Sequence, residues 1–170
     1  NFFFGGNASY FGSSSEDQLE TRRQNINGGI SFQNNAWFNA AFNRRFERLD
    51  APFSIRSDIE LPAGDYQFNN INIFYNSDRS KMFGGNVFIN VGDFWNGTKK
   101  SFGGELSLKP NHRLNVQVNY NRNDVDLPGG SFVTNLVGTR VKYSFSTKAF
   151  LNAFLQYNTD ASQFSSNIRF

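Results

Sequence analysis

The chain has 170 residues, a formal net charge of +3 and no cysteine, which excludes a disulfide framework, a thiolate metal site and a cysteine nucleophile. It combines 21 phenylalanines and, by count, 24 asparagines with only 18% charged residues. Its mean hydropathy is −0.52. A chain so rich in aromatic and amide residues, with so few charges, is unlike an average cytosolic domain. The basic residues are scattered, and we therefore expect no nucleic-acid partner.

The dominant pattern along the chain is an alternation of apolar and polar residues. It is clearest in residues 114–121, where even positions are apolar and odd positions carry amides. A β-strand sends successive side chains to opposite faces, so such a segment has one dry face and one wet face. The alternation predicts an all-β chain with ten strands, near residues 2–11, 22–33, 36–48, 67–76, 82–93, 101–109, 113–123, 131–145, 149–158 and 163–170.

The connections between these strands are predicted to alternate between short and long. Short turns are expected at residues 34–35, 76–80, 109–112 and 146–148. Longer loops are expected at 12–21, 49–66, 94–100 and 124–130, with a shorter one near 159–162. Ten residues at about 3.3 Å each, tilted by about 45°, span on the order of 25 Å, the height of the apolar band of an outer-membrane barrel. Residues 1–170 are therefore predicted to form an antiparallel up-and-down transmembrane β-barrel domain, with short periplasmic turns and long outer loops.

The polar positions of the alternating strands are predicted to line the lumen of this barrel. The lining residues are Arg45, Glu47, Glu105, Asn115, Gln117, Asn119, Arg140 and Lys142. Their charged members have two interpretations, a salt-bridged lining and a selectivity ring for a solute. An aromatic girdle at the membrane–water interface is expected from tyrosines near strand ends, namely Tyr75, Tyr120, Tyr143 and Tyr157.

Two arginines have the lipid-facing parity near the predicted outer rim, Arg44 and Arg48. One interpretation is that their stems lie along the apolar surface while their charged heads reach water. The other is contact with lipopolysaccharide phosphates, which suit the guanidinium fork. The expected partners are outer-membrane lipid, lipopolysaccharide and other membrane-protein chains, and the expected location is the bacterial outer membrane.

Catalytic chemistry finds little support in the sequence. His112 is the only histidine and lies in a predicted turn, which argues against a Ser-His-Asp hydrolase and excludes a site with several histidines. Asp124 and Asp126 lie on one side of a predicted extended loop, but a calcium site needs about six oxygens or more. We therefore expect that the protein is not an enzyme and that it binds no metal and no cofactor.

The C-terminal third resembles the membrane domain of the carbohydrate-binding family-nine domain-containing proteins of Gram-negative bacteria, which end in a domain of unknown function. The similarity lies in residues 125–132, 134–137, Arg140, 143–146, 150–153, 156–158 and 166–170. It implies a glycan-binding β-sandwich ahead of an outer-membrane barrel, and no catalytic residue is carried over. In that family more strand-forming sequence follows the last stretch, which implies that this chain is part of a larger barrel. The alternation that ends on Phe170 instead resembles the terminal assembly signal of a complete barrel.

The leading function is a pore, transport or anchoring domain in the outer membrane. The alternative is a soluble β-sandwich adhesin or carbohydrate-binding module that uses the loop aromatics Phe53, Phe94 and Trp95. A third interpretation is a cross-β fibre, because strands rich in asparagine can stack. Irregular loop lengths and the lack of a repeat count against the fibre.

Overall fold

The computed structural model describes residues 1–12 and 19–170, and within them the protein is all β. Ten antiparallel strands form one sheet: β1 (Phe2–Gly12), β2 (Leu19–Ser31), β3 (Trp37–Leu49), β6 (Gly64–Asn76), β7 (Phe83–Phe94), β8 (Gly97–Leu108), β9 (Leu114–Leu127), β10 (Gly130–Ser144), β11 (Phe150–Asn158) and β12 (Gln163–Arg169). A separate hairpin consists of β4 (Phe53–Arg56) and β5 (Ile59–Leu61). None of the described residues form a helix long and apolar enough to span a membrane.

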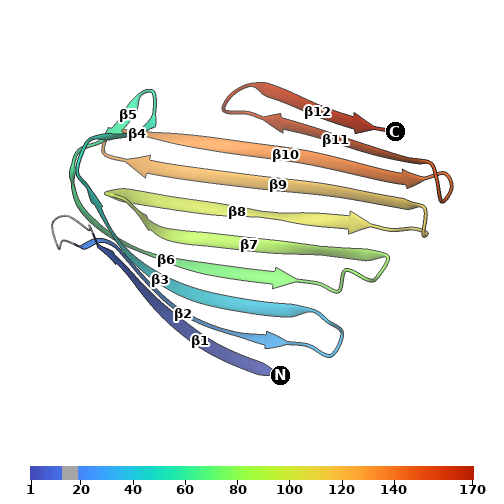
Figure 1. Ribbon diagram of the computed structural model, residues 1–170, viewed down its shortest axis with the longest axis horizontal. Coiled ribbons are helices and arrows are strands. Elements are labelled where there is room, and N and C mark those ends of the chain that lie inside the picture. Colours follow the sequence, from blue (N-terminus) through green and yellow to red (C-terminus); the bar gives the residue numbers. More distant parts are fainter. Residues whose placement is uncertain (13–18) are drawn as a thin grey trace.

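Each strand of the sheet pairs with its neighbour in the chain, and only the β4–β5 hairpin interrupts this order, between β3 and β6 (Figure 1). The prediction of ten antiparallel strands in up-and-down order is therefore confirmed. One end of the sheet carries the hairpin and the other carries both chain termini. We call these the hairpin end and the termini end.

Two of the predicted long loops are wrong. Strand β8 begins at Gly97 and β9 ends at Leu127, so residues 94–100 and 124–130 contain only tight turns. The physical reason is cross-strand pairing of charged residues, since Lys100 lies opposite Asp124 in the ladder. Loop composition therefore misled the prediction here. Of the loop predicted at 12–21, residues 13–18 lie outside the described part of the chain.

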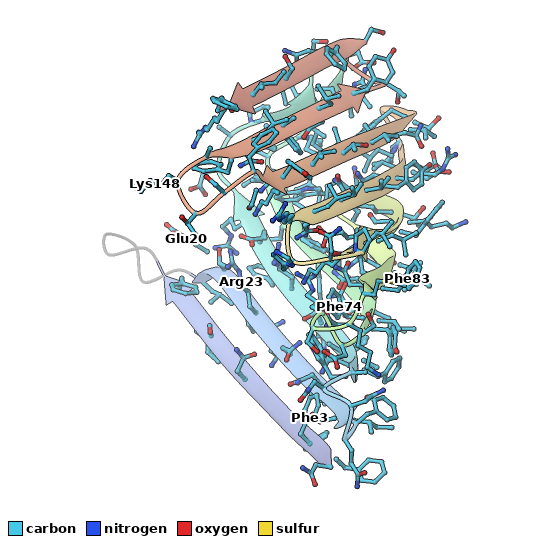
Figure 2. All side chains as sticks on the ribbon, turned by 90° about the vertical axis from the view of Figure 1, so that its right-hand side faces the viewer. Phe3, Glu20, Arg23, Phe74, Phe83 and Lys148 are labelled. Atoms are coloured by element: carbon cyan, nitrogen blue, oxygen red, sulfur yellow. The ribbon has the colours of Figure 1, made fainter. Side chains whose placement is uncertain are left out.

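The sheet curves into a trough, and Arg23 lies inside it while Phe83 lies outside (Figure 2). The edge strands β1 and β12 are not paired with each other, so the sheet is not closed into a barrel. The concave face carries one parity of every strand and the convex face carries the other, because the strand register is continuous from β2 to β10. The transmembrane barrel itself stays a prediction.

The buried apolar core is small and lies at the hairpin end. One cluster joins Ile59 of β5 to Val125 and Leu127 of β9. A second joins Leu61 of β5 to Tyr66 and Phe68 of β6. The hairpin therefore folds over the concave face of the sheet, and its own alternating residues supply the contacts.

Candidate functional site

A ladder of asparagine side chains crosses the concave face. The Nδ2 of Asn25 donates to Oδ1 of Asn43 at 2.7 Å, and the Nδ2 of Asn43 donates to Oδ1 of Asn70 at 2.9 Å. Asn90 continues the ladder by donating to Asn72 of the neighbouring strand. A primary amide carries both donors and an acceptor, so a row of them across paired strands satisfies itself. This row, which we call the amide ladder, accounts for part of the richness in asparagine.

The polar row continues on the other half of the sheet with hydroxyl groups. The Oγ of Ser101 donates to Oδ1 of Asn123 at 2.8 Å, and the Nδ2 of Asn123 donates to Oγ1 of Thr134 at 3.1 Å. Strand register makes these contacts possible, because Ser101 lies opposite Asn123 and Asn123 lies opposite Thr134. One row of polar side chains thus crosses the concave face from β2 to β10.

A cavity of about 840 Å³ lies on the concave face beside the amide ladder. Its lining includes Asn43, Asn70 and Asn90 together with the cations Arg23, Arg45 and Lys99 and the aromatic rings Phe68 and Trp95. Amide groups and cations offer hydrogen bonds to a polar ligand. The cavity therefore suits a hydrated polar solute better than an apolar one.

The predicted lining residues Arg45 and Glu47 lie on the concave face near the hairpin end. Glu47 lies 3.7 Å from Arg23 and 3.9 Å from Arg45, and it accepts a hydrogen bond of 2.7 Å from Thr21. One carboxylate thus faces two guanidinium groups. This group of side chains therefore keeps an excess of positive charge.

The predicted lining residues of β8 and β9 also lie on the concave face. Glu105 accepts a hydrogen bond from Gln117 at 3.4 Å and lies 3.8 Å from Arg79 of the β6–β7 turn. Asn115 accepts a hydrogen bond from Ser107 at 3.4 Å. Asn119 lies opposite Gly138. A Cβ on residue 138 would lie 2.2 Å from the Asn119 Oδ1, so the glycine at this position provides the space that the Asn119 amide needs.

Arg140 and Lys142 lie on the concave face of β10, nearer the termini end. The Arg140 guanidinium carbon lies 5.0 Å from the centre of the Phe154 ring, a cation–π distance. Lys142 lies between Asn115 and Asn152 in the ladder. Arg140 and Lys142 lie toward the termini end of β10, whereas Arg45 lies toward the hairpin end of β3. The structure therefore separates the predicted charged residues along the strands and does not gather them into a single ring.

The convex face carries a band of apolar residues. In β3 this apolar band runs from Phe38 to Phe42 and ends at Arg44, and in β9 it runs from Leu114 to Tyr120 and ends at Arg122. Cross-strand pairs join Phe38 to Tyr120 in one row, through residues of β6, β7 and β8. In β3 this row lies at the border of the apolar band that is nearer the termini end. In β9 the same row lies at the opposite border of the band, nearer the hairpin end. The apolar band therefore slopes relative to the rows of paired residues.

The four tyrosines predicted to form a girdle lie at the borders of this apolar band. Tyr75 and Tyr143 lie on its termini side, at the ends of β6 and β10. Tyr120 and Tyr157 lie on its hairpin side, and the hydroxyl of Tyr120 donates to Asn135 at 2.8 Å. The girdle itself stays a prediction, since these positions say nothing about lipid.

The two arginines predicted for the outer rim lie on the convex face, beyond the apolar band. Arg48 makes a two-pronged contact with Asp65, at 2.7 Å from Nε and 2.9 Å from Nη2. Arg44 is exposed and lies opposite Asn69. Arg48 is thus already held by a carboxylate, whereas the Arg44 head faces solvent.

The β4–β5 hairpin is the feature that the sequence prediction missed, because residues 49–66 were treated as one loop. Its signal was present, since Phe53 and Ile55 alternate with polar residues, as do Ile59 and Leu61, around Ser57 and Asp58. Four aromatic rings surround Trp95 in the β7–β8 turn, and the hairpin contributes one of them, that of Phe53. Their centroids lie 5.4 Å (Tyr66), 5.6 Å (Phe68), 6.2 Å (Phe53) and 6.5 Å (Phe94) from that of Trp95.

One ion pair ties the hairpin to the far side of the sheet. The Nη1 of Arg56 lies 2.6 Å from Asp160 in the β11–β12 turn, and its Nε lies 3.2 Å from Asp58 within the hairpin. The hydrogen bond that Arg56 donates to Asp160 holds the pKa of Arg56 above its ordinary value. The Arg56 guanidinium also lies over the Phe132 ring, at 4.8 Å. The hairpin therefore bridges from β3 and β6 to β10 and the β11–β12 turn.

Replacing Asp160 by asparagine is expected to loosen this tie, because the charge-assisted hydrogen bond becomes a weaker neutral one. Protease cleavage within residues 50–63 is then faster than in the parent protein. Asp58→Asn is the matched control, since Asp58 pairs with the same arginine but lies within the hairpin. Equal cleavage of the two variants would show that Asp160 does not hold the hairpin down.

The two faces together define a class of architecture, a single curved antiparallel sheet with a polar concave wall and an apolar convex wall. Comparison of the chain with protein-family models, curated proteins and solved structures gave no match.

Proposed function

We propose that the chain forms the wall of a bacterial outer-membrane β-barrel whose concave face lines a water-filled passage. The slope of the apolar band is the observation that carries the proposal. Barrel strands tilt by about 35–45°, so a band parallel to the membrane crosses the rows of paired residues obliquely. The band of this sheet crosses its rows in that way, from Phe38 in β3 to Tyr120 in β9.

Charges on the concave face support a wet interior. Arg140 and Lys142 lie within the length of β10 over which the convex face carries the apolar band, from Val137 to Tyr143. Charged side chains at membrane depth are costly unless they face water or partners. Water on the concave side meets this requirement.

The soluble sandwich is the weaker alternative, because sandwiches bury the apolar face of one sheet against another. Among the described residues no second sheet covers the convex face, and Leu106 at its centre is 75% exposed. Other exposed apolar residues of this face are Ile26, Phe42, Ile71, Val87, Phe102, Val118, Val137 and Leu155. An apolar surface of this extent needs a cover, and lipid chains are the cover we propose.

Completion of the barrel requires pairing partners for both edges of the described sheet. Lipid offers no hydrogen bonds, so the open edges of β1 and β12 must be paired in a membrane. We propose that further strands of the same protein or of other membrane-protein chains pair with them. Capture of glycans by a domain outside residues 1–170, and contact of Arg44 with lipopolysaccharide, are part of the same proposal.

The proposal is tested by the behaviour of the purified protein in detergent. We expect it to refold only when detergent or lipid is present, and to migrate differently on a gel before and after boiling. A folded, monomeric protein in buffer without detergent would overturn the proposal. Binding of that monomer to a glycan array would favour the sandwich module instead.

A further inference from the structure

The concave face carries most of the net positive charge of the sheet. Among the described residues paired in the ten-stranded ladder, this face has six cations and two anions, namely Arg23, Arg45, Lys99, Arg140, Lys142 and Arg169 against Glu47 and Glu105. The convex face is nearly balanced, with five cations and four anions, namely Arg22, Arg44, Arg48, Lys100 and Arg122 against Asp65, Asp93, Asp124 and Asp126.

The two carboxylates of the concave face are already engaged. Glu47 faces Arg23 and Arg45, and Glu105 faces Arg79 of the β6–β7 turn. Within residues 1–12 and 19–170, no carboxylate forms an ion pair with Lys99, Arg140, Lys142 or Arg169. Lys99 and Arg140 instead lie over the aromatic rings of Phe94 and Phe154, which leave their charge uncompensated.

These cations occupy both ends of the concave wall. Arg23, Arg45 and Lys99 line the cavity of about 840 Å³ on the hairpin side of the sheet. Lys142 and Arg169 share a row with Asn152 near the termini end, and Arg140 lies in the adjacent row of the same parity. A solute moving along the strands therefore meets positive charge on both sides of the neutral amide ladder.

We propose that the passage selects anionic solutes, an inference that rests on the proposed pore function. Positively charged walls concentrate anions and exclude cations, as in anion-selective pores. A wall potential of about one kT is enough to favour a monovalent anion over a cation by about sevenfold. The amide ladder supplies hydrogen bonds to the solute without adding charge.

Ion selectivity in planar bilayers tests the inference, with potassium chloride as the probe. We expect the reversal potential across a salt gradient to show chloride permeating better than potassium. The preference falls as salt rises from about 0.1 M to 1 M, because the Debye length shrinks from about 10 Å to 3 Å. Conductance without chloride preference would overturn the inference while leaving the proposed passage intact. A folded protein that conducts neither ion would overturn the inference together with the water-filled passage of the proposed function.

Two variants separate the concave cations from charge in general. Arg140→Gln combined with Lys142→Gln removes two of the excess positive charges, so the logarithm of the permeability ratio is expected to fall by about half. Arg122→Gln, on the convex face of β9, removes a cation that faces away from the passage and leaves the ratio unchanged. If the double variant and Arg122→Gln change the permeability ratio equally, the inference is overturned. The difference in gel migration before and after boiling checks that each variant is folded. If the parent protein shows no such difference, the result contradicts the proposed function rather than the selectivity.

Discussion

Arginine in place of Val118 is expected to block stable insertion into lipid. Val118 is 44% exposed on the convex face and lies within the apolar band of β9, between Val116 and Tyr120. An arginine on the lipid face near the bilayer midplane destabilises a barrel by about 2–4 kcal/mol. The fraction of protein refolded into lipid vesicles, measured over a urea series, reports the loss.

The next residue along the strand is the matched control. Gln117 lies on the concave face and donates a hydrogen bond of 3.4 Å to Glu105, so an arginine there gains a carboxylate partner. We expect Gln117→Arg to refold nearly as well as the parent protein. In a soluble protein, an exposed valine tolerates arginine, so equal behaviour of the two variants would contradict the membrane assignment of the convex face.

The strand pattern was predictable because its period is local. Leu114, Val116 and Val118 alternate with amides in the sequence, and the same alternation separates the two faces of β9. The slope of the apolar band was not predictable in this way, because it depends on register. Phe38 pairs with Tyr75, and the same row of cross-strand pairs continues to Tyr120. Only this register shows that the row lies at one border of the apolar band in β3 and at the other border in β9.

The face of the sheet on which each predicted residue lies followed from the sequence, but the arrangement of these residues did not. The parity of Arg45, Glu105 and Arg140 follows from alternation, whereas their separation into different rows depends on the register of strands far apart in sequence. The amide ladder was also out of reach, since Asn43 and Asn70 meet only after the β4–β5 hairpin is placed between their strands.

Polar composition explains the errors in loop length. Lys100 and Asp124 are typical of loops when read singly, but in the sheet they face each other across β8 and β9. Their strands extend beyond the apolar band, where solvent and cross-strand charge pairs replace apolar contacts. Polar residues next to an alternating segment therefore indicate the border of the band rather than the end of the strand.

Truncation of Leu61 to alanine is expected to release the β4–β5 hairpin from the concave face. Leu61 is 1% exposed and belongs to the cluster with Tyr66 and Phe68, so the change leaves a cavity where β5 contacts β6. Such truncations cost about 2–5 kcal/mol. The loss falls on hairpin docking rather than on the ladder, because backbone pairing of the ten strands does not involve Leu61.

Hydrogen exchange of the hairpin amides measures this release. Faster exchange is expected in β4 and β5 for Leu61→Ala, with little change in β8 and β9. Glu60→Ala is the control, since Glu60 is the exposed residue between Ile59 and Leu61 on the same strand. Unchanged exchange in the leucine variant would show that the buried cluster does not hold the hairpin.

Release of the hairpin also bears on passage along the concave wall. Docked, it lies over the concave side at the hairpin end, with Ile59 against Val125 and Arg56 reaching Asp160. If solutes pass along this wall, the docked hairpin narrows their path, and Leu61→Ala raises the single-channel conductance above that of Glu60→Ala. Faster hydrogen exchange in the hairpin without a rise in conductance would show that the solute path does not run beneath the hairpin. The amide ladder would then border a passage that the hairpin does not cover.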